Sequence, residues 1–184
     1  MVSETLVTLE GCLTDRRISY LKKLRNMSEH QISEHFVIQE FVNPETYAEH
    51  KEDSIDFIDK KLIDIAEFVR VDLGVAVTIN NWHTGGQFKE SGLRDSNTKT
   101  GSKKSAHKSG KAIDVKVKGM TGNMWYEFVK RNAKNLYDLG LRRIEDKSLA
   151  ISWCHMDTKE HGEPHVIQIV DLTEVTEKIK IIGI

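Results

Sequence analysis

Hydrophobic residues recur at helical spacing in three segments of the chain. The longest stripe, in residues 54–73, consists of isoleucine, leucine and valine and predicts an amphipathic helix that ends at Gly74. A second stripe, which includes two aromatic residues, predicts a helix over residues 123–139, followed by Gly140. A shorter apolar stripe predicts a third helix over residues 14–26.

Short apolar runs outside these helices predict the strands of a sheet. They lie in residues 74–79, 112–117, 149–156 and 165–171. Residues 83–106 form instead a polar segment with four glycines, which is long for a loop in a compact domain unless it has a function. Helices come first and most strands follow, with one helix between them. This order predicts an α+β fold, with an antiparallel sheet and flanking helices.

The length and composition are those of one domain. The chain has 184 residues, enough to bury a sizeable core, and its two prolines and lack of repeats indicate no interdomain linker. We therefore predict a single domain over residues 1–184. Residues 1–35 would form a helical N-terminal elaboration, and residues 36–184 would form the core.

The charge balance limits the partners that we expect. The formal net charge is −1 with 30% charged residues, so no nucleic-acid partner is expected. A basic cluster from Lys99 to Lys111 can either bind an anionic polymer such as a bacterial cell wall or be an ordinary solvated loop. No segment approaches the ~20 apolar residues of a membrane span, so none is expected.

The cysteines and the first residues bear on the compartment. Cys12 and Cys154 lie far apart and suit a reducing compartment better than a disulfide framework. No basic segment followed by an apolar one opens the chain, so we expect no signal peptide and synthesis in the cytoplasm. The sequence indicates no particular oligomeric state.

One segment combines an imidazole and a carboxylate at close spacing. His107 and Asp114 are seven residues apart, with Gly110 between them, and Asp114 lies within an apolar strand-like run. A buried carboxylate without a partner is costly. Two solutions are open at this point: coordination of a metal ion, or a buried ion pair with a residue such as Arg94.

A second apolar run supplies another imidazole. His155 lies in residues 151–157, and two adjacent antiparallel strands can bring it to His107 and Asp114. Such a set can hold Zn²⁺ and leave a fourth position open for water. Asp157 follows on the same face of the strand, where it can orient a ligand imidazole or bind loop backbone. Cys154 would point to the opposite face, into the core.

These segments resemble the motifs of the M15-type zinc peptidases, which share the fold of D-alanyl-D-alanine carboxypeptidase and Hedgehog. Residues 105–114 match the pattern Ser-x-His-x-x-Gly-x-Ala-x-Asp, and residues 153–157 are similar to an aromatic-x-His-x-Asp strand. Gly92-Leu93-Arg94 is similar to the Gly-x-Arg that precedes the first motif, and Phe41-Val42-Asn43-Pro44 resembles the lead-in of the family. The resemblance covers roughly residues 36–158.

The resemblance implies a zinc-dependent peptidase that acts on stem peptides of bacterial peptidoglycan. His107, Asp114 and His155 would hold the zinc ion, and Arg94 would meet a substrate carboxylate. Ser105 would hold the loop of the site, although an ordinary N-terminal cap explains a serine there equally well. The reaction would be that of a D-Ala-D-Ala carboxypeptidase or an L-alanyl-D-glutamate endopeptidase. Release by phage lysis, or transport in a virion, would reconcile a wall substrate with the expected lack of a signal peptide.

The general base departs from the family pattern. Many relatives carry a glutamate three residues before the last ligand, and others a histidine two residues before it. Ser152 and Trp153 occupy these positions here. We expect a carboxylate from elsewhere to replace the base, with Asp157 and Glu163 ahead of Glu145. The alternative is a metal-stabilised binding or virion structural module that has lost the base.

Further histidines can be read as polar surface residues rather than ligands. His83 and His161 lie outside both motifs. His165 follows a Glu-Pro pair that resembles the run before the last ligand in some relatives, but its spacing differs by one residue. All three are therefore expected outside the metal site.

Overall fold

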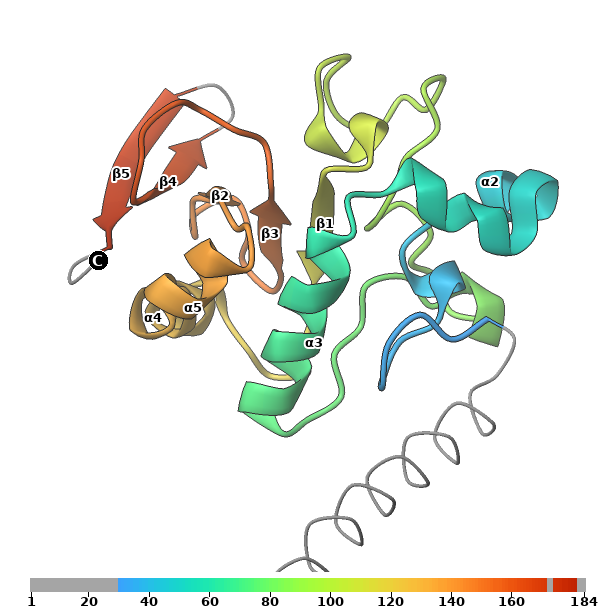
Figure 1. Ribbon diagram of the computed structural model, residues 1–184, viewed down its shortest axis with the longest axis horizontal. Helices are drawn as coiled ribbons and strands as arrows, with labels where there is room; N and C mark the ends of the chain where they lie inside the picture. The colour runs from blue at the N-terminus through green and yellow to red at the C-terminus, as the bar shows by residue number, and fades with distance from the viewer. Residues whose placement is uncertain (1–29, 172–173, 182–184) are drawn as a thin grey trace, which may run out of the picture.

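A computed structural model describes residues 30–171 and 174–181 (Figure 1). Within these residues five strands form one sheet in the order β1-β3-β2-β4-β5. Neighbouring strands are antiparallel except β2 and β4, which are parallel, so the predicted α+β class with a mainly antiparallel sheet is confirmed. The strands are β1 (Ala112–Val115), β2 (Arg143–Glu145), β3 (Cys154–Asp157), β4 (Val166–Asp171) and β5 (Glu174–Lys180).

Helices and 3-10 turns make up the other described elements. The α-helices are α2 (Pro44–His50), α3 (Lys61–Leu73), α4 (Gly122–Arg131) and α5 (Ala133–Asp138). Short 3-10 helices are η1 (Ile38–Glu40), η2 (Lys51–Phe57), η3 (Trp82–Thr84) and η4 (Ala106–Ser109). No helix within the described parts of the chain is both long and apolar enough to cross a membrane. The helix predicted over residues 14–26 lies outside the described residues.

The single helix predicted over residues 54–73 is wrong in its first half. That half forms η2, and the chain is extended at Ile58 before α3 begins. Tertiary hydrogen bonds explain the interruption: Asp59 N donates to Gly110 O at 2.8 Å, and Asp59 Oδ2 accepts from Thr158 Oγ1 at 2.7 Å. The predicted end is confirmed, since Gly74 adopts a left-handed conformation with φ 64°.

The helix predicted over residues 123–139 is divided in two. Asn132, with φ −103° and ψ 15°, separates α4 from α5. Its side chain donates to Asp72 Oδ2 and to Phe128 O, both at 3.3 Å, so it bonds local groups instead of continuing the helix.

Three of the predicted strands are found and one is not. Residues 74–79 form no strand of the sheet. Within the described residues their β-pairing is limited to an isolated bridge between Thr78 and Lys116. Strands β2 and β5 were not predicted, because β2 is short and carries charged residues on one face, and β5 is almost wholly exposed. Neither strand therefore has the apolar run that the prediction relied on.

The two faces of the sheet differ in chemistry. One face is apolar and nearly inaccessible to solvent, and it includes Cys154 as predicted. Helix α3 contacts β1 and helix α5 contacts β4, so helices help to form the core (Figure 1). The residues of this apolar face are Ile113, Val115, Ile144, Cys154, Met156, Ile167 and Ile169. The strand register places charged residues of β1, β2 and β3 together on the opposite face.

Candidate metal centre

His107 reaches the site from a tight turn. It lies in η4, is 2% exposed, and is followed by Gly110 with φ 65°. A Cβ atom at Gly110 would lie 1.9 Å from the carbonyl oxygen of Phe57. Glycine is therefore required both for the left-handed conformation and for the close approach of this backbone. The turn leads directly into β1, which carries Asp114.

Asp114 and His155 meet through strand pairing. They are direct partners in the antiparallel pair of β1 and β3, and Asp114 Oδ1 lies 3.0 Å from His155 Nδ1. His107 Nε2 lies 3.1 Å from His155 Nδ1 and 3.2 Å from Asp114 Oδ1. Tetrahedral zinc with bonds of ~2.0–2.1 Å separates its ligand atoms by about 3.3 Å. The triangle of ligand atoms therefore has nearly the size that zinc requires.

The second nitrogen of each imidazole fixes its tautomer. His107 Nδ1 donates to the carbonyl of Gly92 at 2.8 Å, and His155 Nε2 lies 3.3 Å from Asp157 Oδ2. A carbonyl or an ionised carboxylate can only accept a hydrogen bond. The hydrogen of each neutral imidazole therefore lies on the nitrogen that faces this acceptor, and the inner nitrogen of each ring carries none. The two inner nitrogens then converge with Asp114 Oδ1 as three acceptors without a donor. Either a metal cation between them or a proton on His155 Nδ1 relieves this repulsion.

The acid–base properties of these groups agree with a site built for a cation. Burial acts to lower the pKa of His155, but hydrogen bonds to Asp114 and Asp157 outweigh it and raise the pKa to about 9. Burial acts to raise the pKa of Asp114, but its bonds with His107 and His155 hold it far below its usual range. Burial lowers the pKa of His107, which favours the neutral, ligating form. A proton on His155 is thus the competitor of a metal ion.

Arg94 satisfies the second oxygen of Asp114. Its Nη2 lies 2.9 Å from Asp114 Oδ2, and its Nε donates to Glu90 O at 2.6 Å. The carboxylate thus offers Oδ1 to the histidines and Oδ2 to the guanidinium. The two solutions proposed for Asp114, metal coordination and an ion pair with Arg94, are compatible in this geometry.

The loop that carries Arg94 is fixed to the N-terminal part of the core. Leu93 N donates to Phe41 O at 2.7 Å, and Asn43 Nδ2 donates to Leu93 O at 3.3 Å. A Cβ atom at Gly92 would lie 2.1 Å from Phe41 O, so the backbones pack without space for a side chain. The two sequence segments that resemble the lead-in and the Gly-x-Arg are therefore in direct contact.

Asp157 supports the site and has no free oxygen. Arg143 binds it with two nitrogens, at 3.0 Å from Nε to Oδ1 and at 2.8 Å from Nη2 to Oδ2, and Lys159 N donates to Oδ1 at 3.0 Å. Burial acts to raise the pKa of Asp157, but hydrogen bonds from His155 and Arg143 lower it overall. Both expected roles, orientation of an imidazole and binding of loop backbone, are present in its contacts. A weakly basic, fully bonded carboxylate is unsuited to accept a proton from water.

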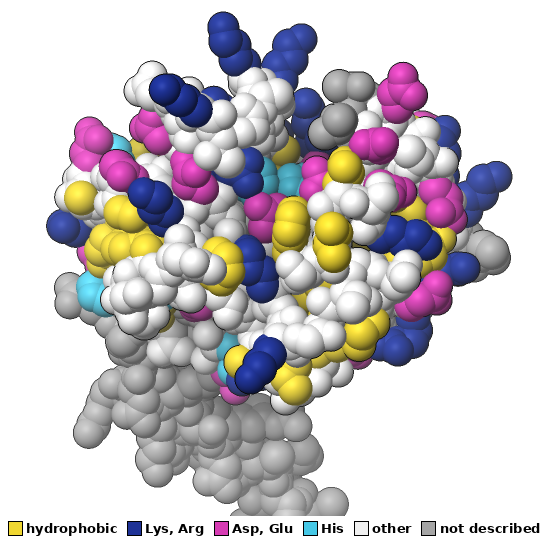
Figure 2. Space-filling model, turned by 180° about the vertical axis from the view of Figure 1, so that it is seen from behind, with side chains coloured by type: hydrophobic (Ala, Val, Ile, Leu, Met, Phe, Trp, Pro, Cys, Tyr) yellow, Lys and Arg dark blue, Asp and Glu magenta, His cyan; other side chains and the backbone are white. Residues whose placement is uncertain are grey.

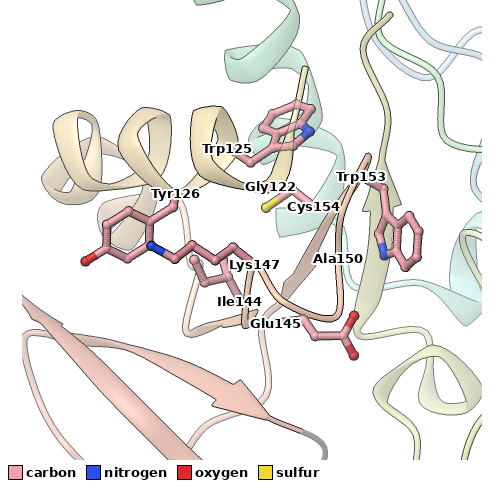
Figure 3. Close-up of a pocket in the computed structure, with 9 residues that line it drawn as sticks. All are labelled: Gly122, Trp125, Tyr126, Ile144, Glu145, Lys147, Ala150, Trp153 and Cys154. Carbon is pink, nitrogen blue, oxygen red and sulfur yellow. The ribbon is translucent and has the colours of Figure 1, made fainter. Parts of the chain in front are cut away.

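Glu145 is the carboxylate that remains available. It lies on β2 and lines the cavity beside the histidines, and its carboxylate makes no hydrogen bond or ion pair within the described residues. Figure 3 shows its carboxylate on the side of the Trp153 indole and directed away from Tyr126 and Lys147. Burial raises the pKa of Glu145, which makes its carboxylate a stronger base.

Glu163, which we ranked above Glu145, is engaged elsewhere. Its oxygens bind Gln168 Nε2 and Lys178 Nζ, each at 2.7 Å, and it does not line the cavity. The geometry therefore favours Glu145 over both carboxylates that we placed ahead of it. Arg143, the partner of Asp157, was not identified from the sequence, although the alternation of Arg143 and Glu145 on one strand face was a usable signal.

An open cavity of about 780 Å³ lies over the three ligand atoms. This volume is within the range of small-molecule and peptide pockets. In Figure 2 histidine and acidic side chains meet near the middle of the face, below a rim of lysine and arginine side chains. The lining residues are Arg94, Gly101, Ser102, Lys103, Lys104, Ser105, Ala106, His107, Asp114, Arg143, Glu145, Trp153, His155, Asp157, Lys159 and Val170.

The remaining predicted positions lie outside the ligand set. Within the described residues, His107, Asp114 and His155 form the one group of histidine, cysteine and acidic side chains that can hold a metal ion. The three further histidines named above are not in it. Ser105 lines the cavity, but its side chain does not cap η4.

Comparisons with models of protein families, with curated proteins and with solved structures find no match to this chain. The interpretation of the site therefore rests on its own geometry and chemistry.

Proposed function

We propose that the protein is a zinc-dependent peptidase. The observation that carries this proposal is the convergence of His107 Nε2, Asp114 Oδ1 and His155 Nδ1 within 3.0–3.2 Å of one another, beneath an open cavity. Two imidazoles and one carboxylate are a typical ligand set of catalytic zinc, which keeps its fourth position for water or substrate. A purely structural zinc site usually has four protein ligands, so the open cavity favours catalysis.

The residues around the ligands would have different roles in hydrolysis. Zinc, when bound, supplies Lewis acidity, which lowers the pKa of water and polarises a carbonyl group. Glu145 would accept the proton of the attacking water and return it to the leaving amine. Arg94 would hold Asp114 with Nη2, and its Nη1, which has no hydrogen-bond partner within the described residues, would stabilise negative charge on the substrate. Asp157 and Arg143 would keep His155 in its ligating orientation.

Peptide stems of bacterial peptidoglycan are the proposed substrate. The motif spacing from Ser105 to Asp114 supports this choice through its resemblance to the zinc peptidases of the wall. The volume of the cavity, about 780 Å³, supports it through size, because a short peptide segment fits a pocket of several hundred Å³. The bond cleaved would join a D-amino acid to its neighbour.

Metal analysis combined with muropeptide digestion tests the proposal. We expect purified protein to hold one zinc ion and to release peptide fragments that mass spectrometry identifies. His107→Ala should lose both zinc and activity, whereas the matched control His83→Ala, a histidine outside the ligand set, should keep both. If zinc-loaded protein cleaves no muropeptide, the site belongs to a metal-stabilised binding module instead. If His107→Ala retains stoichiometric zinc, the ligand assignment itself is incorrect.

A further inference from the structure

The cavity over the ligands carries a positive charge that the chain as a whole does not. Five cationic side chains line it, against three acidic ones, while the formal net charge of the chain is −1. Two of the cations are neutralised locally, since Arg94 pairs with Asp114 and Arg143 pairs with Asp157. Three cationic side chains, Lys103, Lys104 and Lys159, then remain against the single carboxylate of Glu145.

These three lysines have no internal partner. Each is exposed, and the ammonium group of each makes no ion pair or hydrogen bond within residues 30–171 and 174–181. Lys108, in the same basic segment, differs because its Nζ donates to Ser96 O and Thr98 O at 3.2 and 3.0 Å and so holds the loop. Free ammonium groups are thus collected at the cavity, while a neighbouring lysine has a structural role.

The lysines come from two segments that also position the metal ligands. Lys103 and Lys104 immediately precede η4, which carries His107, and Lys159 follows β3, which carries His155. A peptide bound over the ligand atoms would therefore pass among these ammonium groups. Lysine is a flexible point charge, suited to carboxylates whose exact position varies along a peptide.

We propose that Lys103, Lys104 and Lys159 select peptides with free carboxylates next to the scissile bond over the same peptides with amidated carboxylates. This inference rests on the proposed function, because it assumes that peptides bind over the ligand atoms. The exposed ammonium groups of these three lysines attract carboxylates. They contribute mainly to substrate binding, since they contact the substrate and its transition state alike. Salt weakens the selection because exposed charges are screened.

Two matched stem peptides, one with free and one with amidated side carboxylates, test the proposal. For the zinc-loaded protein, we expect KM to be about tenfold lower for the free-carboxylate peptide, because several weak, exposed ion pairs act together. The combined variant Lys103→Gln, Lys104→Gln and Lys159→Gln should abolish this difference, with kcat and zinc content nearly unchanged. Titration calorimetry of both peptides with the zinc-loaded Glu145→Gln protein measures the same selection without turnover.

A control variant distinguishes the effect of the three cavity lysines from the effect of the net charge of the protein. Lys60→Gln, Lys118→Gln and Lys180→Gln change the net charge equally, and these exposed lysines lie outside the cavity. This control should keep the preference for free carboxylates. Equal binding of the two peptides, or equal effects of the two triple variants, would overturn the inference. If no peptide is cleaved but calorimetry still shows the selection, the inference holds and the peptidase proposal fails.

Discussion

Asp114 on β1 lies directly opposite His155 on β3, with 3.0 Å between Oδ1 of the carboxylate and Nδ1 of the imidazole. Because side chains alternate along a strand, the same register puts Asp157 on the face of His155, where it binds the other ring nitrogen. Strand pairing thus sets two ligands and the group that orients one of them. A slip of β3 by one residue would turn His155 and Asp157 to the apolar face, away from Asp114.

Zinc binding should release a proton at neutral pH. The pKa of His155 is raised to about 9 without metal, so Nδ1 is protonated at pH 7 and must lose this proton to become a ligand. The apparent zinc affinity should therefore increase about tenfold per pH unit up to pH 9, and level off above it. Calorimetry in buffers of different ionisation enthalpy measures the release. The absence of any buffer dependence at pH 7 would contradict the raised pKa of His155.

Arg94→Lys should lower kcat/KM by about tenfold or more, which corresponds to roughly 1.4 kcal/mol. Arginine binds Asp114 Oδ2 through Nη2 and Glu90 O through Nε at the same time. A lysine keeps the charge but has no planar fork, so the carboxylate loses its fixed orientation. Steady-state kinetics and zinc analysis measure the effect. Arg131→Lys, at an exposed arginine, serves as the control and should leave both quantities unchanged.

Glu145→Gln and Asp157→Asn should separate chemistry from metal binding. Glutamine at position 145 cannot accept a proton, so kcat should fall by ~10²–10⁴ while zinc is retained. Asparagine at position 157 leaves Arg143 without its charge partner and weakens the bond to His155, so zinc affinity should fall by roughly 10–100-fold. Parallel measurement of kcat and zinc affinity tests the assignment. A Glu145→Gln protein with the wild-type kcat would show that another group is the base.

The sequence predicted the group of candidate ligands better than the elements that surround it. His107, Asp114 and His155 were found because a carboxylate and an imidazole within apolar runs need a chemical reason. The helix over residues 54–73 was predicted as continuous because the apolar spacing persists across Asp59. The interruption depends on hydrogen bonds between Asp59 and residues far along the chain, Gly110 and Thr158, which no local sequence pattern predicts.

The ranking of the candidate bases differs from the one that the geometry favours, for a related physical reason. Sequence spacing placed Asp157 next to His155, but it did not reveal that Arg143 occupies both carboxylate oxygens. Glu145 lies on a strand too short to be predicted, and its position across from β3 follows only from the pairing of β2 with that strand. Residue types were thus sufficient to predict the group that can hold a metal ion, whereas ranking the candidate bases requires the sheet register.

Two glycine substitutions should isolate the close approach that supports His107. Gly74 and Gly110 have nearly the same conformation, with φ 64° and 65°, but a Cβ atom at Gly74 meets nothing within 4 Å whereas one at Gly110 lies 1.9 Å from Phe57 O. Gly74→Ala should therefore cost only the left-handed conformation, about 1–2 kcal/mol of unfolding free energy. Gly110→Ala should lower the free energy of unfolding by a further ~1–3 kcal/mol through overpacking, and it should displace the turn that carries His107.

The comparison of the two variants distinguishes conformational strain from damage to the site. Denaturant unfolding should show a larger loss of stability for Gly110→Ala, and zinc titration should show weaker binding in that variant alone. Gly74 ends α3 and has no contact with the ligands, so Gly74→Ala should bind zinc as the wild type does. Equal stability losses and unchanged zinc affinity in both variants would mean that the backbone of Phe57 can move to make room for the new Cβ atom. In that case the packing of η4 against η2 would not determine the position of His107.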